Sequence, residues 1–379
     1  MKIAITGPHF WPYRRRGSAA YIFNLSNYLV RQGHKVEIIT SKPGKPKIVN
    51  KGNMTITYLR YIQHPVLDGY NINRVHLFTL NCFVHLLRRN YDIVHCIYHP
   101  DGFSAYLQKM FKRLRYVLLV TTTPFTFHWK HSPIDPYMFK KAVTGAKRCV
   151  VPSCYARDCM KRDHDVDCEL IPCGVDLQHF HVNTPKDLST PRILCTAALH
   201  DERKRVPVLI KAFEFLVQGG TKAILQLAGE TTPETNRRLL SMVDSNVRRS
   251  IQILPSVTYK QLPKLYASAA LTVLPSISET FGMSLTESLA CGTPAVGTRS
   301  GAIPEIINDP SVGTLFDTND EKHGLEDPLK LYNAIRRTLE LAKDPDTVHR
   351  CHQHARQYDW RKVGKKLQSL YERVLSGQP

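Results

Sequence analysis

The sequence has no long hydrophobic run and no paired cysteines, and each absence excludes a class of protein. No apolar stretch reaches the roughly 18–20 residues that a membrane-spanning helix needs. The ten cysteines include no C-x-x-C pair, the common spacing of zinc ligands, so a metal site is not expected. Residues 2–6 read as a strand rather than as a signal peptide. We therefore expect a cytoplasmic protein with reduced thiols.

Acidic residues are scarce in the first half of the chain. The 379 residues include 52 Lys and Arg against 32 Asp and Glu, a net charge of +20. Residues 1–180 hold 26 of these basic residues but only 11 of the acidic ones. The imbalance predicts an anionic partner for this half, such as an acidic glycan or the cytoplasmic face of an anionic membrane. A uniformly solvated basic surface is the alternative.

Nucleic acid is a further possible anionic partner. However, the sequence shows neither a recognition helix nor aromatic residues interleaved with basic ones on strands. A basic nucleic-acid-binding protein is therefore the less favoured interpretation, and no nucleic acid is expected among the partners.

Apolar segments of strand length alternate with helical patterns along the chain, which predicts parallel sheets covered by helices. The length exceeds the roughly 250–300 residues that one core supports, so we expect two domains. They are residues 1–180, joined by a C-terminal helix at about 360–379 that begins at Trp360, and residues 190–358, after a polar linker. A loop is expected at 41–47. The predicted strands are 2–6, 36–40, 93–96, 116–121, 149–151, 192–198, 224–229, 251–254 and 271–274, and the predicted helices include 19–31, 102–113, 208–217 and 261–268.

The most informative segment places two carboxylates around a glycine turn. Glu279 follows the predicted strand 271–274, Gly282 makes the turn, and Glu287 lies about one turn into the next helix. Ligands of open α/β sheets bind at the carboxyl ends of strands, and a helix N-terminus offers free N–H groups to anions. The segment predicts a site for an anion or for hydroxyl groups. Two acids placed to complement the helix dipole are the alternative.

The order of motifs around these acids resembles retaining glycosyltransferase family 4, also called glycosyl transferases group 1. The resemblance covers nearly the whole chain and implies the GT-B fold, α/β with two Rossmann-like domains facing each other across a cleft. It implies transfer of a hexose from a nucleoside-diphosphate sugar, UDP- or GDP-linked, to a glycan, lipid or small-molecule acceptor. Retention of configuration and independence of metal ions are also implied. The motifs are Gly17, 33–36, 171–176 with Phe180, Lys204, 227–230, Glu279 with Glu287, 292–294 and 301–305.

The resemblance also assigns roles to single residues. Glu279 and Lys204 become the catalytic residues, near the transferred sugar and the leaving diphosphate, and Glu287 accepts hydrogen bonds from the donor ribose. A solvated loop lysine is the alternative for Lys204, and a solvated basic turn is the alternative for residues 14–17. The other residues assigned to the donor are Phe281, Gly282, Met283, Gly17, Arg16, Arg203, Arg205 and Gly229.

Two positions depart from the family pattern. Ala198 stands where the family usually has an arginine, six residues before the lysine, and Thr123 stands where a histidine is usual. His128 lies nearby at a different spacing. These departures leave open a relative that binds a nucleotide sugar but turns it over weakly.

Overall fold

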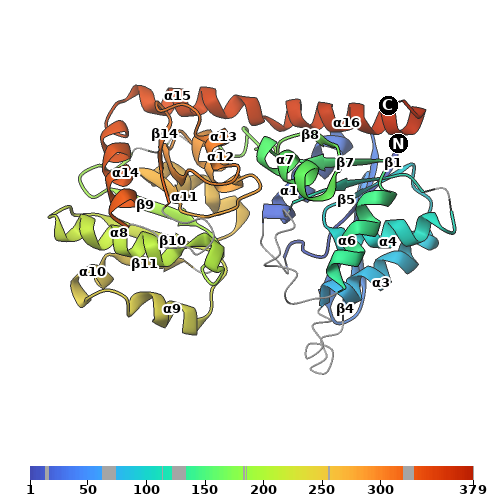
Figure 1. Ribbon diagram of the computed structural model, residues 1–379, viewed down its shortest axis with the longest axis horizontal. Helices are drawn as coiled ribbons and strands as arrows, with labels where there is room; N and C mark the ends of the chain where they lie inside the picture. The colour runs from blue at the N-terminus through green and yellow to red at the C-terminus, as the bar shows by residue number, and fades with distance from the viewer. Residues whose placement is uncertain are drawn as a thin grey trace. The chain divides into compact units, whose positions relative to one another are not determined.

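The computed structural model describes residues 1–12, 17–61, 74–112, 114–121, 134–181, 184, 186–254, 257–318 and 328–378. The chain divides into two compact units, each built around its own mainly parallel sheet (Figure 1). Unit 1 comprises Met1–Gly174 and Trp360–Pro379, and unit 2 comprises Val175–Asp359. The α/β class predicted from the alternating pattern is confirmed.

Unit 1 contains an eight-stranded sheet in the order β3-β4-β2-β1-β5-β6-β7-β8, in which only β3 pairs in the antiparallel direction. The strands are β1 (Lys2–Thr6), β2 (Lys35–Pro43), β3 (Lys47–Lys51), β4 (Met54–Tyr61), β5 (Ile93–Cys96), β6 (Tyr116–Leu119), β7 (Arg148–Val151) and β8 (Cys168–Leu170). The helices are α1 (Gly17–Arg31), α3 (Arg74–Leu87), α4 (His99–Lys109), α6 (Asp135–Gly145), α7 (Cys154–His164) and α16 (Trp360–Ser376).

The β2–β4 region of unit 1 differs from the prediction. The loop expected at 41–47 is wrong in part, because β2 continues to Pro43 and β3 begins at Lys47. The exposed strand β3 carries a lysine at each end, so its sequence lacks the apolar run of a buried strand. Edge strands of this kind protect a sheet from further pairing, and their polar composition hides them from pattern analysis.

Unit 2 contains a six-stranded sheet, all parallel, in the order β11-β10-β9-β12-β13-β14. The order reverses at β9, because β10 and β11 lie on one side of it and β12 to β14 on the other. The strands are β9 (Arg192–Thr196), β10 (Ile224–Ala228), β11 (Ile251–Leu254), β12 (Leu271–Leu274), β13 (Ala295–Thr298) and β14 (Gly313–Phe316). The helices are α8 (Val206–Gln218), α9 (Pro233–Leu240), α10 (Ser245–Arg249), α11 (Leu262–Ser268), α12 (Met283–Ala290), α13 (Ile303–Ile306), α14 (Pro328–Leu341) and α15 (Asp346–Ala355), with short 3-10 turns η1 (Glu202–Lys204), η2 (Tyr259–Gln261) and η3 (Arg356–Tyr358).

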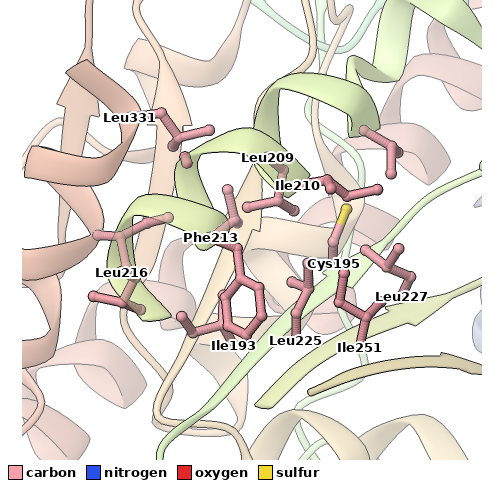
Figure 2. Packing of buried hydrophobic residues seen from close by; sticks show 14 of the residues in the cluster. Ile193, Cys195, Leu209, Ile210, Phe213, Leu216, Leu225, Leu227, Ile251 and Leu331 are labelled. Atoms are coloured by element: carbon pink, nitrogen blue, oxygen red, sulfur yellow. The ribbon is translucent and has the colours of Figure 1, made fainter. Parts of the chain in front are cut away.

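The core of unit 2 forms where α8 covers the sheet (Figure 2). Leu209, Phe213 and Leu216 recur at helical spacing along α8, and all three are at most 2% exposed. They belong to one buried cluster with Ile193 and Leu225, from the adjacent strands β9 and β10. Burial of each such side chain stabilises the fold by about 1.5–3 kcal/mol, which fixes the strand ends that carry the site.

Helix α16 begins at Trp360, as the sequence predicts, and packs within unit 1. The ring of Trp360 lies 5.3 Å from that of Tyr21 in α1. Tyr371 meets Nδ1 of the buried His95 at 2.7 Å, and Gly364 lies so close to Tyr28 that a Cβ atom would approach the ring to 2.5 Å. The last helix is thus fitted closely to the first.

The described residues contain no disulfide, no side-chain cluster suited to a metal ion and no membrane-spanning helix. The ten cysteines form no disulfide, and Asp163, Asp165 and Asp167 pair with Arg162 and Lys161. No cluster of three or more His, Cys, Asp or Glu side chains in this part of the chain is suited to a metal ion. None of its helices has the length and hydropathy needed to cross a bilayer.

Candidate active site

The candidate site of unit 2 lies beyond the carboxyl ends of β9 and β12, the point where the strand order reverses. Such a switch point is where open α/β sheets bind their ligands. The loop after β9 contains η1, and the loop after β12 leads to α12. The two loops are joined because the Ile277 N–H donates to the carbonyl of Arg203 at 3.0 Å.

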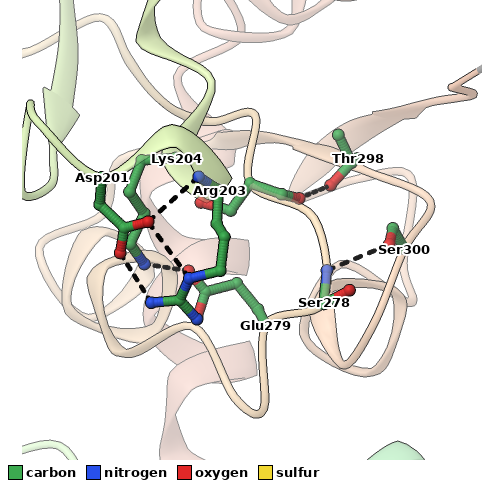
Figure 3. Close-up of polar contacts among 8 residues, drawn as sticks. Asp201, Arg203, Lys204, Ser278, Glu279, Thr298 and Ser300 are labelled. Atoms are coloured by element: carbon green, nitrogen blue, oxygen red, sulfur yellow. Dashed lines mark hydrogen bonds and ion pairs between the residues drawn. The ribbon is translucent and has the colours of Figure 1, made fainter. Parts of the chain in front are cut away.

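An ion pair between Lys204 and Glu279 also links the two loops (Figure 3). Their side chains are 20% and 15% exposed, respectively. Burial would raise the pKa of Glu279, but Lys204, with a smaller contribution from Arg203, holds that pKa below its ordinary value. Glu279 is therefore a carboxylate at neutral pH. The Lys204 ammonium has three N–H donors, so it can pair with Glu279 and still meet an anion.

The backbone of Glu279 is fixed by the segment that follows β13. The Ala302 N–H donates to the carbonyl of Glu279 at 2.8 Å, and the Ser278 N–H donates to Ser300 Oγ at 3.3 Å. Gly301 has a φ of +61°, and a Cβ atom there would lie 2.6 Å from the Glu279 carbonyl oxygen. Only glycine allows this approach, so the segment holds Glu279 in one position.

Arg203 and Arg205 differ in their surroundings. Arg203 makes a two-point contact with Asp201, with Nη2 to Oδ2 at 2.6 Å and Nε to Oδ1 at 3.2 Å, and its side chain is 35% exposed. Arg205 is only 4% exposed, and burial lowers its pKa to about 10. Arg203 and Lys204 are thus the more accessible cations of this loop.

Glu287 lies on α12 and is 8% exposed. The Tyr266 hydroxyl donates to Glu287 Oε2 at 2.9 Å and lies 2.7 Å from Thr196 Oγ1 at the end of β9. Burial raises the pKa of Glu287 to about 7, although the Tyr266 hydrogen bond opposes the shift. The carboxyl group thus changes charge near neutral pH, which is typical of functional positions.

The predicted Phe281–Met283 turn forms the start of α12. Gly282 is the N-cap residue with a φ of +107°, a conformation that favours glycine. Phe281 is 6% exposed and packs edge-on against Tyr358, with 5.6 Å between the ring centroids. Met283 opens the helix, whose first N–H groups have no partner within the helix and can bind an anion.

Gly229 directly follows β10 and has a φ of +151°. A Cβ atom there would lie 1.8 Å from the carbonyl oxygen of Ala197, just after β9. The glycine therefore lets the two strand ends approach each other. Of the remaining predicted residues, Gly17 is the first residue of α1 in unit 1, whereas Arg16, Thr123 and His128 lie outside the described residues.

Sequence reasoning missed two side chains that orient this site. Asp201 caps η1 and holds Arg203, and its spacing two residues before the arginine is a signal that could have identified it. Tyr266 gives no such signal, because it reads as an apolar residue of α11 and meets Glu287 only after folding.

Sequence comparison places these loops in a known family. Residues 178–357 match the sequence model described as glycosyl transferases group 1, and residues 15–179 match that of glycosyltransferase family 4. The chain belongs to the group 1, family 4 glycosyltransferases. The glycosyltransferase class of enzyme predicted from the motifs is therefore confirmed.

Relatives within the family are distant in sequence. The N-acetyl-alpha-D-glucosaminyl L-malate synthase of Bacillus anthracis is 25% identical, covering 94% of this chain and 93% of that protein. The D-inositol 3-phosphate glycosyltransferase of Mycobacteroides abscessus is 24% identical, covering 99% and 90%. The corresponding enzyme of Acidothermus cellulolyticus is 28% identical, but the match spans only 45% of this chain and 35% of that one.

Solved structures show the same fold. A sucrose-phosphate synthase from Thermosynechococcus elongatus superposes with a TM-score of 0.82 at 19% identity, covering the whole of both chains. A protein from Anabaena, solved with UDP and glucose, gives a TM-score of 0.73 at 13% identity, covering 98% of this chain and 99% of that one. The GT-B class with two Rossmann-like domains is thereby confirmed for this family 4 member.

Proposed function

We propose that this glycosyltransferase moves a hexose from a nucleoside-diphosphate sugar to a glycan, lipid or small-molecule acceptor, with retention of configuration and without a metal ion. The observation that carries the proposal is the Lys204–Glu279 ion pair at the switch point of unit 2. It combines a cation for a leaving diphosphate with a carboxylate for sugar hydroxyls.

The donor would be held by cations and N–H groups at its diphosphate and by a carboxyl group at its ribose. We assign the diphosphate to Lys204, Arg203 and the free N–H groups at the start of α12, because preorganised donors stabilise the charge that develops as the glycosidic bond breaks. We assign the ribose hydroxyls to Glu287. The protein solved with UDP and glucose supports a UDP-sugar as the first donor to test, with GDP-sugars next.

Retention is proposed from the family and from the residues of this site. We assign the side chains gathered here to binding and orienting a donor, and we give none of them the role of nucleophile. The leaving phosphate would then accept the acceptor's proton on the same face of the sugar. Lys204 would neutralise the phosphate charge, the role that a metal ion plays in other transferases.

A nucleotide-sugar-binding protein with weak turnover is the second candidate. Ala198 favours it, because an alanine in the loop after β9 cannot supply the cation usual at this position. Loss of one donor to a developing charge commonly costs about 3–4 kcal/mol of transition-state stabilisation.

One experiment separates the two candidates. The protein is incubated with UDP-, GDP- and ADP-sugars, with and without pooled acceptors, and released nucleoside diphosphate and new glycosides are measured. We expect release with one donor, stimulation by an acceptor, resistance to EDTA and a product whose anomeric configuration matches the donor. Tight donor binding without release or product would establish the second candidate, and an inverted product would overturn the retaining mechanism.

A further inference from the structure

Helices α3, α4 and α6 of unit 1 form an outer surface that carries exposed apolar side chains. Helix α4 packs against both α3 and α6 (Figure 1). Of the nine large hydrophobic residues that the described chain exposes most, five lie on or beside these helices. They are Leu80, Met110, Phe111, Ile134 and Tyr137, which are 49% to 69% exposed. Single exposed apolar residues are ordinary, but a group on adjacent helices marks an interaction surface.

Ring contacts link neighbouring helices at two places on this surface. Phe83 of α3 lies 5.9 Å from Phe111, the second residue after α4. Phe103 of α4 lies 6.0 Å from Tyr106 and also 6.0 Å from Tyr137 of α6. These contacts join α3 to the residues that follow α4, and α4 to α6. We call this surface the α3–α4–α6 face.

Helical periodicity explains why these residues face outward. On α3, Phe78, Cys82 and Leu86 belong to the buried core, and they recur every four residues. Leu80 and Phe83 lie on another side of the same helix, since residues three or four apart share a face. Helix α3 is thus apolar on more than one side, whereas a surface helix of a globular protein usually has one apolar stripe.

Basic residues lie on and beside the helices of the α3–α4–α6 face. Exposed basic side chains follow α3, occur at and after the end of α4 and lie within α6, and in the described chain none of them pairs with a carboxylate; they are Arg88, Arg89, Lys109, Lys112 and Lys140. Lys141 lies over the rings of Tyr106 and Tyr137, at 5.8 and 5.6 Å from their centroids. The long stems of such side chains can cover apolar surface while the charges stay in water.

Acidic side chains are almost absent from this region. The sequence from residue 74 to 148 has 12 Lys and Arg but only three acids, Asp92, Asp101 and Asp135. Asp101 is fully buried, Asp135 lies between the imidazoles of His76 and His99, and Asp92 accepts the N–H of Lys2. The charge of the face is therefore not balanced by the acids of residues 74–148, and Glu37 of β2, the acid that meets α3, pairs with His85.

We propose that the α3–α4–α6 face binds the surface of an anionic lipid bilayer. The exposed apolar side chains would enter the boundary between headgroups and acyl chains, and the surrounding Lys and Arg would meet lipid phosphates. A second copy of this chain fits the face less well, because self-pairing would bring its cations together without acids to neutralise them. This inference does not depend on the proposed sugar donor.

Vesicle sedimentation tests the proposal with the full chain. We expect the protein to pellet with vesicles of phosphatidylcholine and phosphatidylglycerol at low salt, and much less with pure phosphatidylcholine. The double variant Met110→Ser/Phe111→Ser should bind these vesicles at least about tenfold more weakly, since it removes two exposed apolar groups. In Arg88→Gln/Lys140→Gln the affinity for anionic vesicles should fall roughly fivefold for each charge removed.

Matched controls change the same kinds of residue elsewhere. Ile48→Ser/Phe215→Ser removes exposed apolar groups, and Lys222→Gln/Lys264→Gln removes two exposed charges. Both should bind like the wild type. Equal losses of vesicle binding in test and control variants would mean that net charge alone causes the binding, and would overturn the assignment to the α3–α4–α6 face. Failure of the wild type to bind anionic vesicles would overturn the proposal outright. Concentration-dependent self-association that Met110→Ser/Phe111→Ser abolishes, without vesicle binding, would assign the face to a second copy instead.

Discussion

At the scale of single residues, Glu287 shows how burial gives a carboxyl group a role that its sequence position alone does not. A glutamate one turn into a helix is ordinarily ionised and exposed. Here it is only 8% exposed and accepts a hydrogen bond from the Tyr266 hydroxyl, and burial raises its pKa to about 7. Its charge therefore depends on pH within the range in which enzymes work.

This shift predicts a pH-dependent donor affinity. Above about pH 7 Glu287 is a carboxylate and would accept hydrogen bonds from ribose hydroxyls more strongly, because hydrogen bonds to charged groups are worth about 1 kcal/mol more than neutral ones. Affinity for the nucleoside diphosphate, measured by calorimetry, should thus rise about three- to fourfold from pH 6 to pH 8. In Glu287→Gln the affinity should be lower, and this part of the pH dependence should vanish. The same pH dependence of affinity in the variant as in the wild type would contradict the assignment of Glu287 to the ribose.

The same shift has a consequence for stability. The folded pKa lies above the ordinary value of 4.5, so the folded state binds the proton more tightly than the unfolded state does. This contribution to the free energy of unfolding is present below about pH 4.5 and is lost as pH rises to about 7 and above. Glu287→Gln should lack the decline, which denaturant unfolding of both proteins at several pH values would show.

At the scale of elements, the fit of α16 against α1 depends on a glycine. A Cβ atom at Gly364 would meet the Tyr28 ring at 2.5 Å, so Gly364→Ala should push the helices apart. Overpacking of this kind costs about 1–3 kcal/mol, which exceeds the gain of up to about 1 kcal/mol in helix propensity. The melting temperature should therefore fall.

Ser369→Ala is the matched control for that prediction, since Ser369 is exposed on the same helix. It should leave the melting temperature unchanged or raise it slightly. Adding Tyr28→Ala to Gly364→Ala should recover part of the loss, because the two residues touch and their effects do not add. A Gly364→Ala protein as stable as the wild type would contradict the close packing.

The strands also show which parts of the structure can be predicted from the sequence and which cannot. Buried strands such as β1, β5 and β12 were predicted at their observed positions, because short apolar runs bounded by turns are typical of parallel sheets. The strand β3 was not predicted, because an exposed edge strand has no apolar pattern. At the site, the order of motifs predicted Lys204 and Glu279, but contacts such as Tyr266 with Glu287 arise only when distant segments pack together.

At the scale of the whole molecule, each unit has its own sheet, and the chemical groups that we assign to a donor gather at the switch point of unit 2. The family membership gives the class of reaction, and the Lys204–Glu279 pair gives the place where that reaction would occur. The basic α3–α4–α6 face of unit 1 adds a second surface with a different ligand.

The most direct test of the central claim is the rate of nucleoside diphosphate release by Glu279→Gln, with donor affinity measured on the same sample. The account predicts that kcat falls by about 10²–10³, as for loss of one group that stabilises developing charge, while donor affinity changes only a few-fold. Glu214→Gln, which alters a carboxylate paired with Lys211 on α8, should keep the wild-type rate. Wild-type turnover by Glu279→Gln would contradict the account.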